Sequence, residues 1–548
     1  MREETARAMK IWSSSAWVVG SAAISIAALL LSPLLSQRAR AYGGLWSSQS
    51  SPIDQTAEEI IFVDNGDSTV TAVVKIEYAG PPQKFAWLIP VPGTPTVGFS
   101  SSTVFERLDA ATAPQYWLEV AVMGTCKKQD APAAGLDAGS GTAGGPGAAG
   151  TTASPIGVID QGSVGPYDYV NLLVDPTLDD PAAVATDWLS MNGYDLTDLD
   201  SKVLSPYLKA GLNLLAFKLQ SSADTGAIRP VTLTYESKLP MIPIRPTAVA
   251  AQGDMGMKIW VIGPSRAVPK NYESVAIDDA RIDWLSVPKY IAGTLPAGGA
   301  GMVDPYATAP SNYDAVVTAA VSKAGGRGFV TELGAPASQF RDKVWSTTDE
   351  QQLAMISSQG YTDGIDAILA ASTHYGGWDG WKEAIEGATT LPPDVTVDEL
   401  SHNPEQYRGV AVVDTQKFLQ LLDERVVRPV ADTAALLYGA PYLTRLYSTM
   451  SAEAMTVDPV FGYKPDLTQV SNVHIAKQVI ECRPNLTRDD APWHIELPQS
   501  GHANSTTPSR SNQCSVSRVG SDGAGSALAL GLPLVGFGLA LRQRRVRR

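Results

Sequence analysis

The first half of the chain carries the alternation of apolar and polar positions that is typical of β-strands. Apolar residues occupy every second position from Phe85 to Val91, the period of a half-buried strand. Pro90 places this strand at a sheet edge or makes it the irregular end of one. Two β-rich runs, Ile60 to Val63 and Val70 to Tyr78, flank Asn65-Gly66, a pair typical of a hairpin turn.

The second half changes to helical spacing. The run from Leu212 to Leu219 still predicts a buried strand. Helices are predicted after it, at Tyr313 to Ser322, Glu350 to Ser358, Gly364 to Ala371 and Thr415 to Leu422. The pattern indicates the α+β class, with a mainly antiparallel β-rich region over residues 42–300 and a more helical second half over residues 301–490.

Length and composition divide the chain further. A chain of 548 residues, 44% of them hydrophobic, can bury a sizeable core and exceeds one typical domain. Residues 130–155 are almost entirely Ala, Gly, Ser, Thr and Pro, so we expect a flexible insertion there. Residues 491–523 read as a polar linker.

The N-terminus has the layout of a secretory signal peptide over residues 1–41. Basic residues precede an apolar stretch from Ala16 to Leu35, and the A-x-A signal ends at Ala41. This predicts cleavage before Tyr42 and export. Because the apolar stretch is longer than usual, an uncleaved anchor is the alternative.

The C-terminus predicts attachment to a membrane. Cys514 and a Ser/Gly spacer precede an apolar run over residues 524–541, long enough to cross a bilayer. The Arg-rich tail over residues 542–548 would stay cytoplasmic and leave the body outside. A single-pass anchor is one interpretation. The pattern also resembles the myxobacterial carboxy-terminal sorting domain, which implies cleavage near Cys514 and a lipid-linked or surface-transferred cysteine.

The net charge of the chain restricts the kinds of partner that it can bind. The formal charge is −14, and because the leader carries +3 and the segment after Cys514 carries +5, residues 42–514 carry −22. Phosphate backbones repel so acidic a body, so we expect no nucleic-acid partner. The two remaining cysteines, Cys126 and Cys482, predict either a disulfide or two buried thiols.

Linear motifs for catalysis or cofactors are missing from the sequence. None of the five histidines lies four residues from another, and neither HExxH nor G-x-S-x-G occurs. Ser286 and Lys289 match S-x-x-K by letter, but Pro288 disfavours the helical turn that this motif needs. We therefore predict no cofactor and no metal site, and the sequence favours a non-enzymatic protein without deciding the question.

One aromatic cluster is a candidate binding loop. The stretch from His374 to Trp381 combines glycines with Tyr375, Trp378, Asp379 and Trp381. Such residues can stack on sugar rings or anchor a protein partner. The alternative is a loop between helices whose tryptophans fill the core.

Several segments resemble one bacterial family, the domain of unknown function 2330. They lie in order at Ala86–Pro92, Gly162–Tyr169, Trp188–Tyr194, Leu233–Ser237 and Pro243–Arg245. The resemblance covers roughly residues 42–300 and implies an exported bacterial envelope protein. It carries no known activity and no known catalytic residues.

Two hypotheses follow from the sequence. The first is a membrane- or surface-anchored envelope protein that binds a polymer or a protein without catalysis. The second is an exported hydrolase of glycans or peptides with an unrecognised carboxylate site, since paired carboxylates leave no linear motif.

Overall fold

The computed structural model describes the body of the chain between its two ends. The described residues are 44–45, 55–75, 85–127, 157–194, 196, 201–220, 228–249, 251–291 and 309–497. The predicted signal peptide, the predicted insertion, Cys514 and the predicted membrane segment lie outside them. Within the described ranges, no helix is long and apolar enough to cross a membrane.

An eight-stranded sheet forms the centre of the described structure. Its order is β13-β15-β18-β11-β2-β3-β10-β5. The strands are β2 (Gln55–Asp64), β3 (Thr69–Lys75), β5 (Thr96–Phe99), β10 (Val231–Glu236), β11 (Ala251–Gly263), β13 (Glu273–Val275), β15 (Gly328–Pro336) and β18 (Tyr442–Met450). Because β15 and β18 come from the second half of the sequence, this sheet continues across the boundary expected at residue 300.

A five-stranded sheet packs against one face of the central sheet. Its order is β1-β4-β9-β8-β7. The strands are β1 (Gly44–Leu45), β4 (Ala86–Val91), β7 (Gly157–Val164), β8 (Tyr167–Leu173) and β9 (Asn213–Leu219). Phe62 of β2, Leu233 of β10 and Phe217 of β9 share one buried cluster, so the two sheets form a sandwich with a common core. Helices α3 (Pro181–Met191) and α4 (Ser205–Lys209) cover the outer face of the smaller sheet.

The other face of the central sheet carries helix α2 (Ser102–Thr112), whose Phe105 packs edge-on against Trp260 of β11. Helix α5 (Tyr313–Lys323) packs against β15 and β18.

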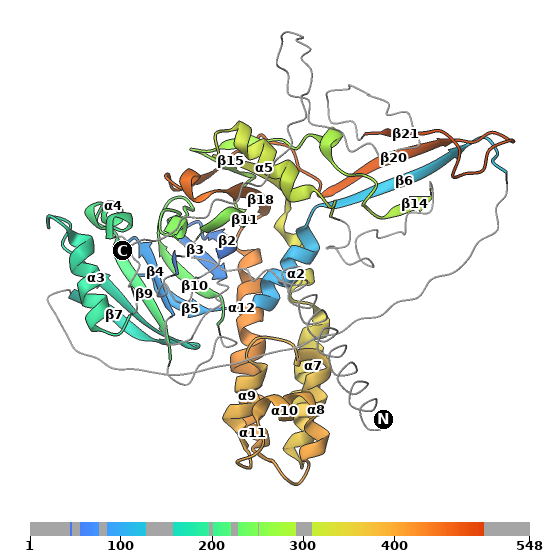
Figure 1. The fold of residues 1–548 in the computed structure, drawn as a ribbon. Helices are drawn as coiled ribbons and strands as arrows, with labels where there is room; N and C mark the ends of the chain where they lie inside the picture. The colour runs from blue at the N-terminus through green and yellow to red at the C-terminus, as the bar shows by residue number, and fades with distance from the viewer. Residues whose placement is uncertain are drawn as a thin grey trace, which may run out of the picture.

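Between β15 and β18 the chain leaves the sheet and forms a helical module, residues 341–441, which projects away from the sandwich (Figure 1). Its helices are α6 (Arg341–Val344), α7 (Thr347–Ser358), α8 (Gly364–Tyr375), α9 (Trp381–Ala388), α10 (Val397–His402), α11 (Thr415–Leu421) and α12 (Arg428–Ala435). A π-helical stretch, Leu422–Val427, joins the last two. The short strands β16 (Thr389–Thr390) and β17 (Val412–Val413) pair within the module.

A four-stranded arm projects from the sandwich on the side away from the five-stranded sheet, at the right of Figure 1. Its order is β14-β6-β20-β21, and its strands are β6 (Gln115–Met123), β14 (Lys289–Ile291), β20 (Val473–Glu481) and β21 (Trp493–Glu496). A further pair, β12 (Ala267–Pro269) and β19 (Phe461–Tyr463), lies beside the central sheet. Strand β21 occupies the first part of the segment that we expected to be linker.

The α+β class is confirmed, and so are the four helices predicted for the second half, which correspond to α5, α7, α8 and α11. The second half also supplies the strands β15, β18, β20 and β21, which the sequence pattern did not show. Most strand pairs are antiparallel. The parallel pairs are β2 with β11 and β13 with β15 in the central sheet, and β6 with β20 and β14 with β6 in the arm.

Candidate functional site

The predicted stacking loop joins α8 to α9, and most of it is packed inside the helical module. Tyr375 is 0% exposed and Trp381 is 3% exposed. The Tyr375 hydroxyl donates to the backbone carbonyl of Asp349 at 2.7 Å, and the Trp381 ring meets Phe418 edge-on. The interpretation as an exposed stacking surface is therefore wrong for Tyr375 and Trp381, because both rings fill the core of the module.

The other two predicted residues face helix α2. Trp378 is half-buried, and the Arg107 guanidinium lies 4.6 Å from the centroid of its ring. An oxygen of Asp379 accepts a hydrogen bond from the backbone N–H of Ser102 at 2.6 Å, at the N-terminus of α2, where a negative charge is favoured. The loop is thus a contact between the helical module and the sandwich.

A buried carboxylate strengthens the same contact. Asp349 receives two hydrogen bonds from Arg107, at 2.9 and 3.1 Å, and lies 2.8 Å from the ring of His374. The Ser346 hydroxyl also donates to it. The capping box of α7 joins the same two residues, since the backbone N–H of Ser346 donates to the Asp349 carboxylate and the backbone N–H of Asp349 donates to the Ser346 Oγ. Burial raises the pKa of Asp349, but the hydrogen bonds from Arg107, Ser346 and His374 outweigh burial and lower the pKa to about 2. Both carboxylate oxygens are engaged, so we interpret this cluster as a docking contact.

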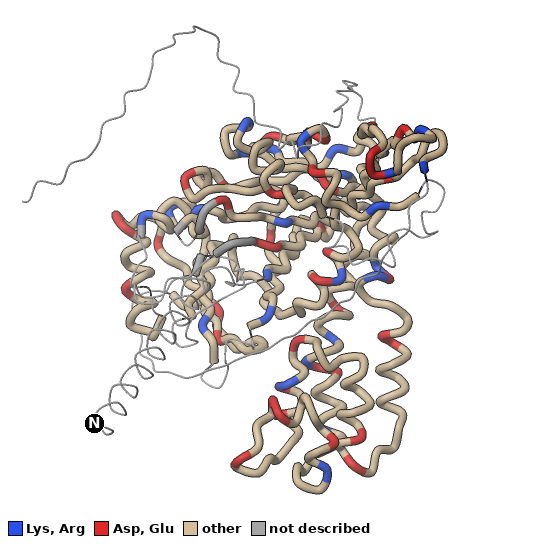
Figure 2. The backbone as a smooth tube through the Cα atoms, turned by 45° about the vertical axis from the view of Figure 1, so that its right-hand side comes forward, with Lys and Arg blue, Asp and Glu red and all other residues tan. Residues whose placement is uncertain are grey.

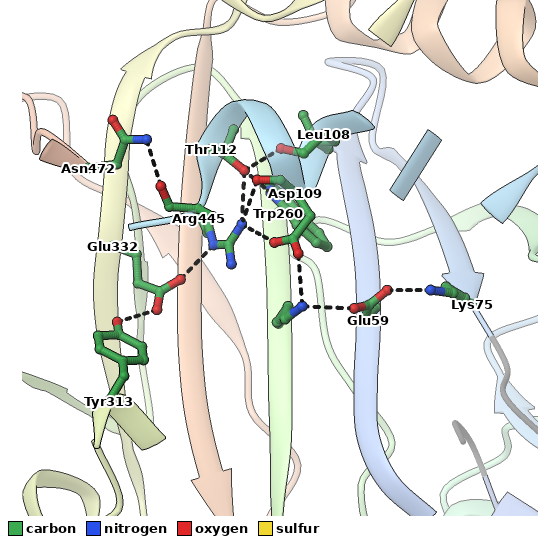
Figure 3. Close-up of polar contacts among 12 residues, drawn as sticks. Glu59, Lys75, Leu108, Asp109, Thr112, Trp260, Tyr313, Glu332, Arg445 and Asn472 are labelled. Carbon is green, nitrogen blue, oxygen red and sulfur yellow. Dashed lines mark hydrogen bonds and ion pairs between the residues drawn. The ribbon is translucent and has the colours of Figure 1, made fainter. Parts of the chain in front are cut away.

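A second charged network lies between α2 and the central sheet (Figure 3). Arg445 of β18 pairs with Asp109 of α2 and with Glu332 of β15. Lys258 of β11 lies 3.1 Å from Asp109 and 3.1 Å from Glu59. The network therefore ties one helix to four strands of the sheet, β2, β11, β15 and β18.

The network is close to neutral. Lys75 lies 3.0 Å from Glu59 and brings the cations to three, Lys75, Lys258 and Arg445, against the anions Glu59, Asp109 and Glu332. Burial alone would raise the pKa of Asp109. The positive charges of Arg445 and Lys258 outweigh burial and hold the pKa well below its ordinary value. A balanced buried network of this kind holds structure together, and the lowered pKa values of Glu59 and Asp109 keep these two carboxylates ionised at neutral pH.

The feature best suited to a ligand is an apolar cavity of about 80 Å³ between the two sheets. One wall is the inner face of the central sheet, with Ile60, Phe62, Ala72, Val74 and Leu233. The opposite wall is β4 with its flanking residues, Trp87 to Pro92, and a third side is the segment from Met241 to Thr247. The volume exceeds what a few water molecules need and suits a small apolar group.

Four residues with polar side chains line the cavity within these walls: Glu58, Tyr235, Ser237 and Thr247. Glu58 is 2% exposed and Thr247 is 1% exposed. Tyr235 of β10 is half-buried. Burial raises the pKa of Tyr235 above its ordinary value, so the hydroxyl keeps its proton and can donate it. Sequence reasoning missed this site, because its walls come from segments far apart in the chain.

The two cysteines of the body form a disulfide. Cys126 follows β6 and Cys482 follows β20, and their Cα atoms are 4.8 Å apart. Gly124 has a φ of +83°, and a Cβ there would lie 2.5 Å from the Cys482 carbonyl oxygen, so glycine permits this close approach. Among the described residues no group of three or more His, Cys, Asp or Glu side chains is placed to hold a metal ion. Ala41 and Cys514, the predicted processing residues, lie outside these ranges.

A family model described as "Uncharacterized protein conserved in bacteria (DUF2330)" matches residues 39–344. The match covers more than half of the chain, and the chain belongs to this family. No curated protein and no solved structure matches the chain. The match spans the cavity and ends where the helical module begins.

Proposed function

We propose that this protein is exported to the bacterial cell envelope, is held at a membrane or displayed on the cell surface, and binds a small apolar molecule between its two sheets without transforming it. The observation that carries the proposal is the apolar cavity of about 80 Å³, whose walls come from both sheets of the family domain. Binding sites for small molecules are typically apolar hollows with a few polar groups of this kind.

Binding is favoured over catalysis because the charged side chains with the strongest contacts are engaged by one another. Asp349 is held by Arg107 and Ser346, and Asp109 and Glu332 are held by Arg445. A general acid or base needs a proton that a substrate can reach. A polymer-binding surface at the aromatic loop is not part of this proposal, since Tyr375 and Trp381 lie in the core.

The location rests on the two ends of the sequence. Mass spectrometry of the intact protein recovered from its native envelope tests it. A mass that begins at Tyr42 and ends near Cys514, with a lipid-sized addition, would support sorting to the surface. A mass that includes Arg548 would instead mean a permanent single-pass anchor. A mass that begins at Met1 would contradict cleavage after Ala41.

Extraction of the protein recovered from the envelope tests the binding. We expect organic solvent to release an apolar molecule in near-equal amount to the protein. Ala72→Leu, which places a larger, branched aliphatic side chain inside the cavity, should reduce that amount strongly. The control is Ala435→Leu, the same change at an exposed position of α12. Equal amounts from all three proteins, or no bound molecule and no binding of an apolar dye, would contradict the function.

A further inference from the structure

A lysine amine and two carboxylates meet in the buried network between α2 and the central sheet (Figure 3). The Nζ of Lys258 lies 3.1 Å from Oδ2 of Asp109 and 3.1 Å from Oε1 of Glu59. The three side chains are only 15%, 5% and 10% exposed, and they come from β11, α2 and β2. An amine held against a carboxylate and shielded from water is already positioned for amide formation.

The second oxygen of Asp109 is held by a guanidinium. Its Oδ1 accepts a hydrogen bond from Arg445, which is buried on β18. Attack of an amine on the carboxyl carbon places negative charge on an oxygen, and a cation fixed at that oxygen stabilises it. The site differs in this respect, and in its burial, from a surface ion pair such as that of Lys477 with Glu496, whose side chains are 43% and 52% exposed.

Glu59 is placed to transfer the protons that the reaction needs. The ion pair of Lys258 with Asp109 is the state before the reaction, so the ammonium group must first give up a proton. Transfer of that proton to Glu59 produces the neutral amine, which is the nucleophile. A bond then forms between Nζ of Lys258 and Cγ of Asp109, and the bond from Cγ to Oδ2 breaks. One ammonium hydrogen stays in the amide and two leave with Oδ2 as water, so no further reactant is required.

The charges of the network favour reaction at Asp109. An amide there removes one cation and one anion, and burying charge costs free energy that a neutral amide avoids. The ion pair of Lys75 with Glu59 remains balanced. The ion pair of Arg445 with Glu332 remains balanced as well. Reaction at Glu59 would instead neutralise the carboxylate that pairs with Lys75 at 3.0 Å.

We propose that Lys258 and Asp109 form an amide bond within the folded chain, with Glu59 transferring the protons. Arg445 stabilises the negative charge that develops on Oδ1 during the attack. The bond joins α2 to β11 across 149 residues of sequence and fixes the helix on the sheet. It is independent of a ligand in the cavity.

Peptide mass spectrometry of the purified full-length chain, reduced and digested with trypsin, tests the inference. Trypsin does not cleave after a lysine whose Nζ is acylated. The bond therefore predicts a branched peptide in which residues 108–127 are joined to residues 239–266. We expect its mass to be one water less than the sum of the two linear peptides, and its fragments to place the branch between Asp109 and Lys258.

Two variants test the roles of the residues. Lys258→Arg keeps the positive charge, but its guanidinium stays protonated and is not a nucleophile, so residues 108–127 should appear as a linear peptide. Glu59→Gln removes the proton acceptor and should give the same loss of the branched peptide. The exposed pair of Lys477 with Glu496 is the control within each digest, and it should stay unlinked in all three proteins.

Linear peptides alone from the folded wild type would overturn the inference, and this result does not depend on whether either variant folds. A branch from Lys258 to Glu59 would overturn the choice of Asp109. An undiminished branched peptide in Glu59→Gln would overturn the proton-transfer role of that carboxylate. A link between Lys477 and Glu496 at a similar level would show that proximity alone produces the bond, and would contradict a built site.

Discussion

Arg445 shows how a single residue can hold several elements in place. Its guanidinium contacts Asp109 of α2 and Glu332 of β15, and it lies 5.2 Å from the centroid of the Trp260 ring on β11. Burial opposes its charge, but the two carboxylates raise the pKa of Arg445 above its ordinary value. The charge therefore persists in the interior, and its removal would leave two buried carboxylates unbalanced.

Arg445→Met should lower the free energy of unfolding by about 3–5 kcal/mol, because breaking a buried ion pair leaves uncompensated charge. Denaturant unfolding followed by tryptophan fluorescence measures the loss. The matched control is Arg408→Met, since Arg408 pairs with Asp363 and Asp366 at a partly exposed site of the helical module. We expect a loss of less than about 1 kcal/mol there. Equal losses in the two variants would contradict a structural role for the buried network.

Asp349 predicts an acid-sensitive contact between the module and α2. In the folded protein the pKa of Asp349 is about 2, below its ordinary value of 3.8. Its contribution to the free energy of unfolding is therefore fully present above about pH 4. The contribution is lost as the pH falls through about 2. Asp349→Asn should cost about 1–2 kcal/mol at pH 7 and flatten the loss of stability below pH 4.

Thermal unfolding of both proteins from pH 7 to pH 2 measures this effect. Asp342→Asn, at a carboxylate whose side chain is 72% exposed, should follow the wild type across the range. An acid profile of Asp349→Asn parallel to that of the wild type would show that this carboxylate does not titrate with folding.

At the scale of elements, the helical module docks through a glycine. Gly380 has a φ of +85°, and a Cβ there would lie 2.3 Å from the carbonyl oxygen of Arg425 and 2.8 Å from a guanidinium nitrogen of Arg229. Arg229 belongs to the sandwich and donates to Glu383 of α9 at 2.6 Å. A side chain at residue 380 would therefore disturb both the backbone and an ion pair that joins the two parts.

Gly380→Ala should loosen the module without unfolding the sheets. Hydrogen exchange followed by mass spectrometry should show faster exchange in α9 and α11 and unchanged exchange in β11. Gly377→Ala is the control, since a Cβ there would meet nothing within 4 Å. Equal exchange in the two variants would show that the close approach at Gly380 does not determine docking.

The elements also show how far the sequence predicts the fold. Helices with a clear apolar face, such as α8, could be predicted, and so could β9, whose residues are nearly all apolar. Strand β18 could not, because it buries polar residues such as Arg445, Ser448 and Thr449, whose partners lie on other elements and remove the alternation from its sequence. The cavity could not be predicted either, because the segments that form its walls are far apart in the sequence and come together only in the folded chain.

The aromatic loop shows that the sequence can also predict a binding surface that the fold does not form. Its composition suits a binding surface, but composition does not say which face of a helix meets a neighbour. Asp379 contacts the start of α2 from a position 277 residues further along the chain. Without that packing, a core tryptophan and a ligand-binding tryptophan look alike in the sequence.

On the scale of the whole molecule, the fold of the family domain depends on a strand outside the matched region. Strand β18 lies between β15 and β11, both within residues 39–344, whereas β18 begins at Tyr442. The sheet is thus completed only after the helical module has been traversed. The sandwich includes at least residues up to Met450, and the module is an insertion in it. Acidic residues are spread through both parts (Figure 2).

The disulfide of the four-stranded arm predicts a distinct effect on stability. Cys126 and Cys482 are separated by 356 residues, so their bond restricts the unfolded chain over most of its length. Replacing both residues by Ser should cost about 2–5 kcal/mol and lower the thermal midpoint. Reduction of the wild type should have the same effect, and the double variant should not respond to the reductant.

Cys514→Ser is the control that separates the disulfide from the modification proposed for Cys514. We expect it to leave the thermal midpoint unchanged, because the bridge between Cys126 and Cys482 is intact, while the mass of the protein recovered from the envelope loses its lipid-sized addition. The double variant should show the reverse, a lower midpoint with the addition retained. A normal midpoint in the double variant would mean that the parallel pairing of β6 and β20 holds the arm without the bridge. A lower midpoint in Cys514→Ser would instead assign Cys514 a part in the folded body.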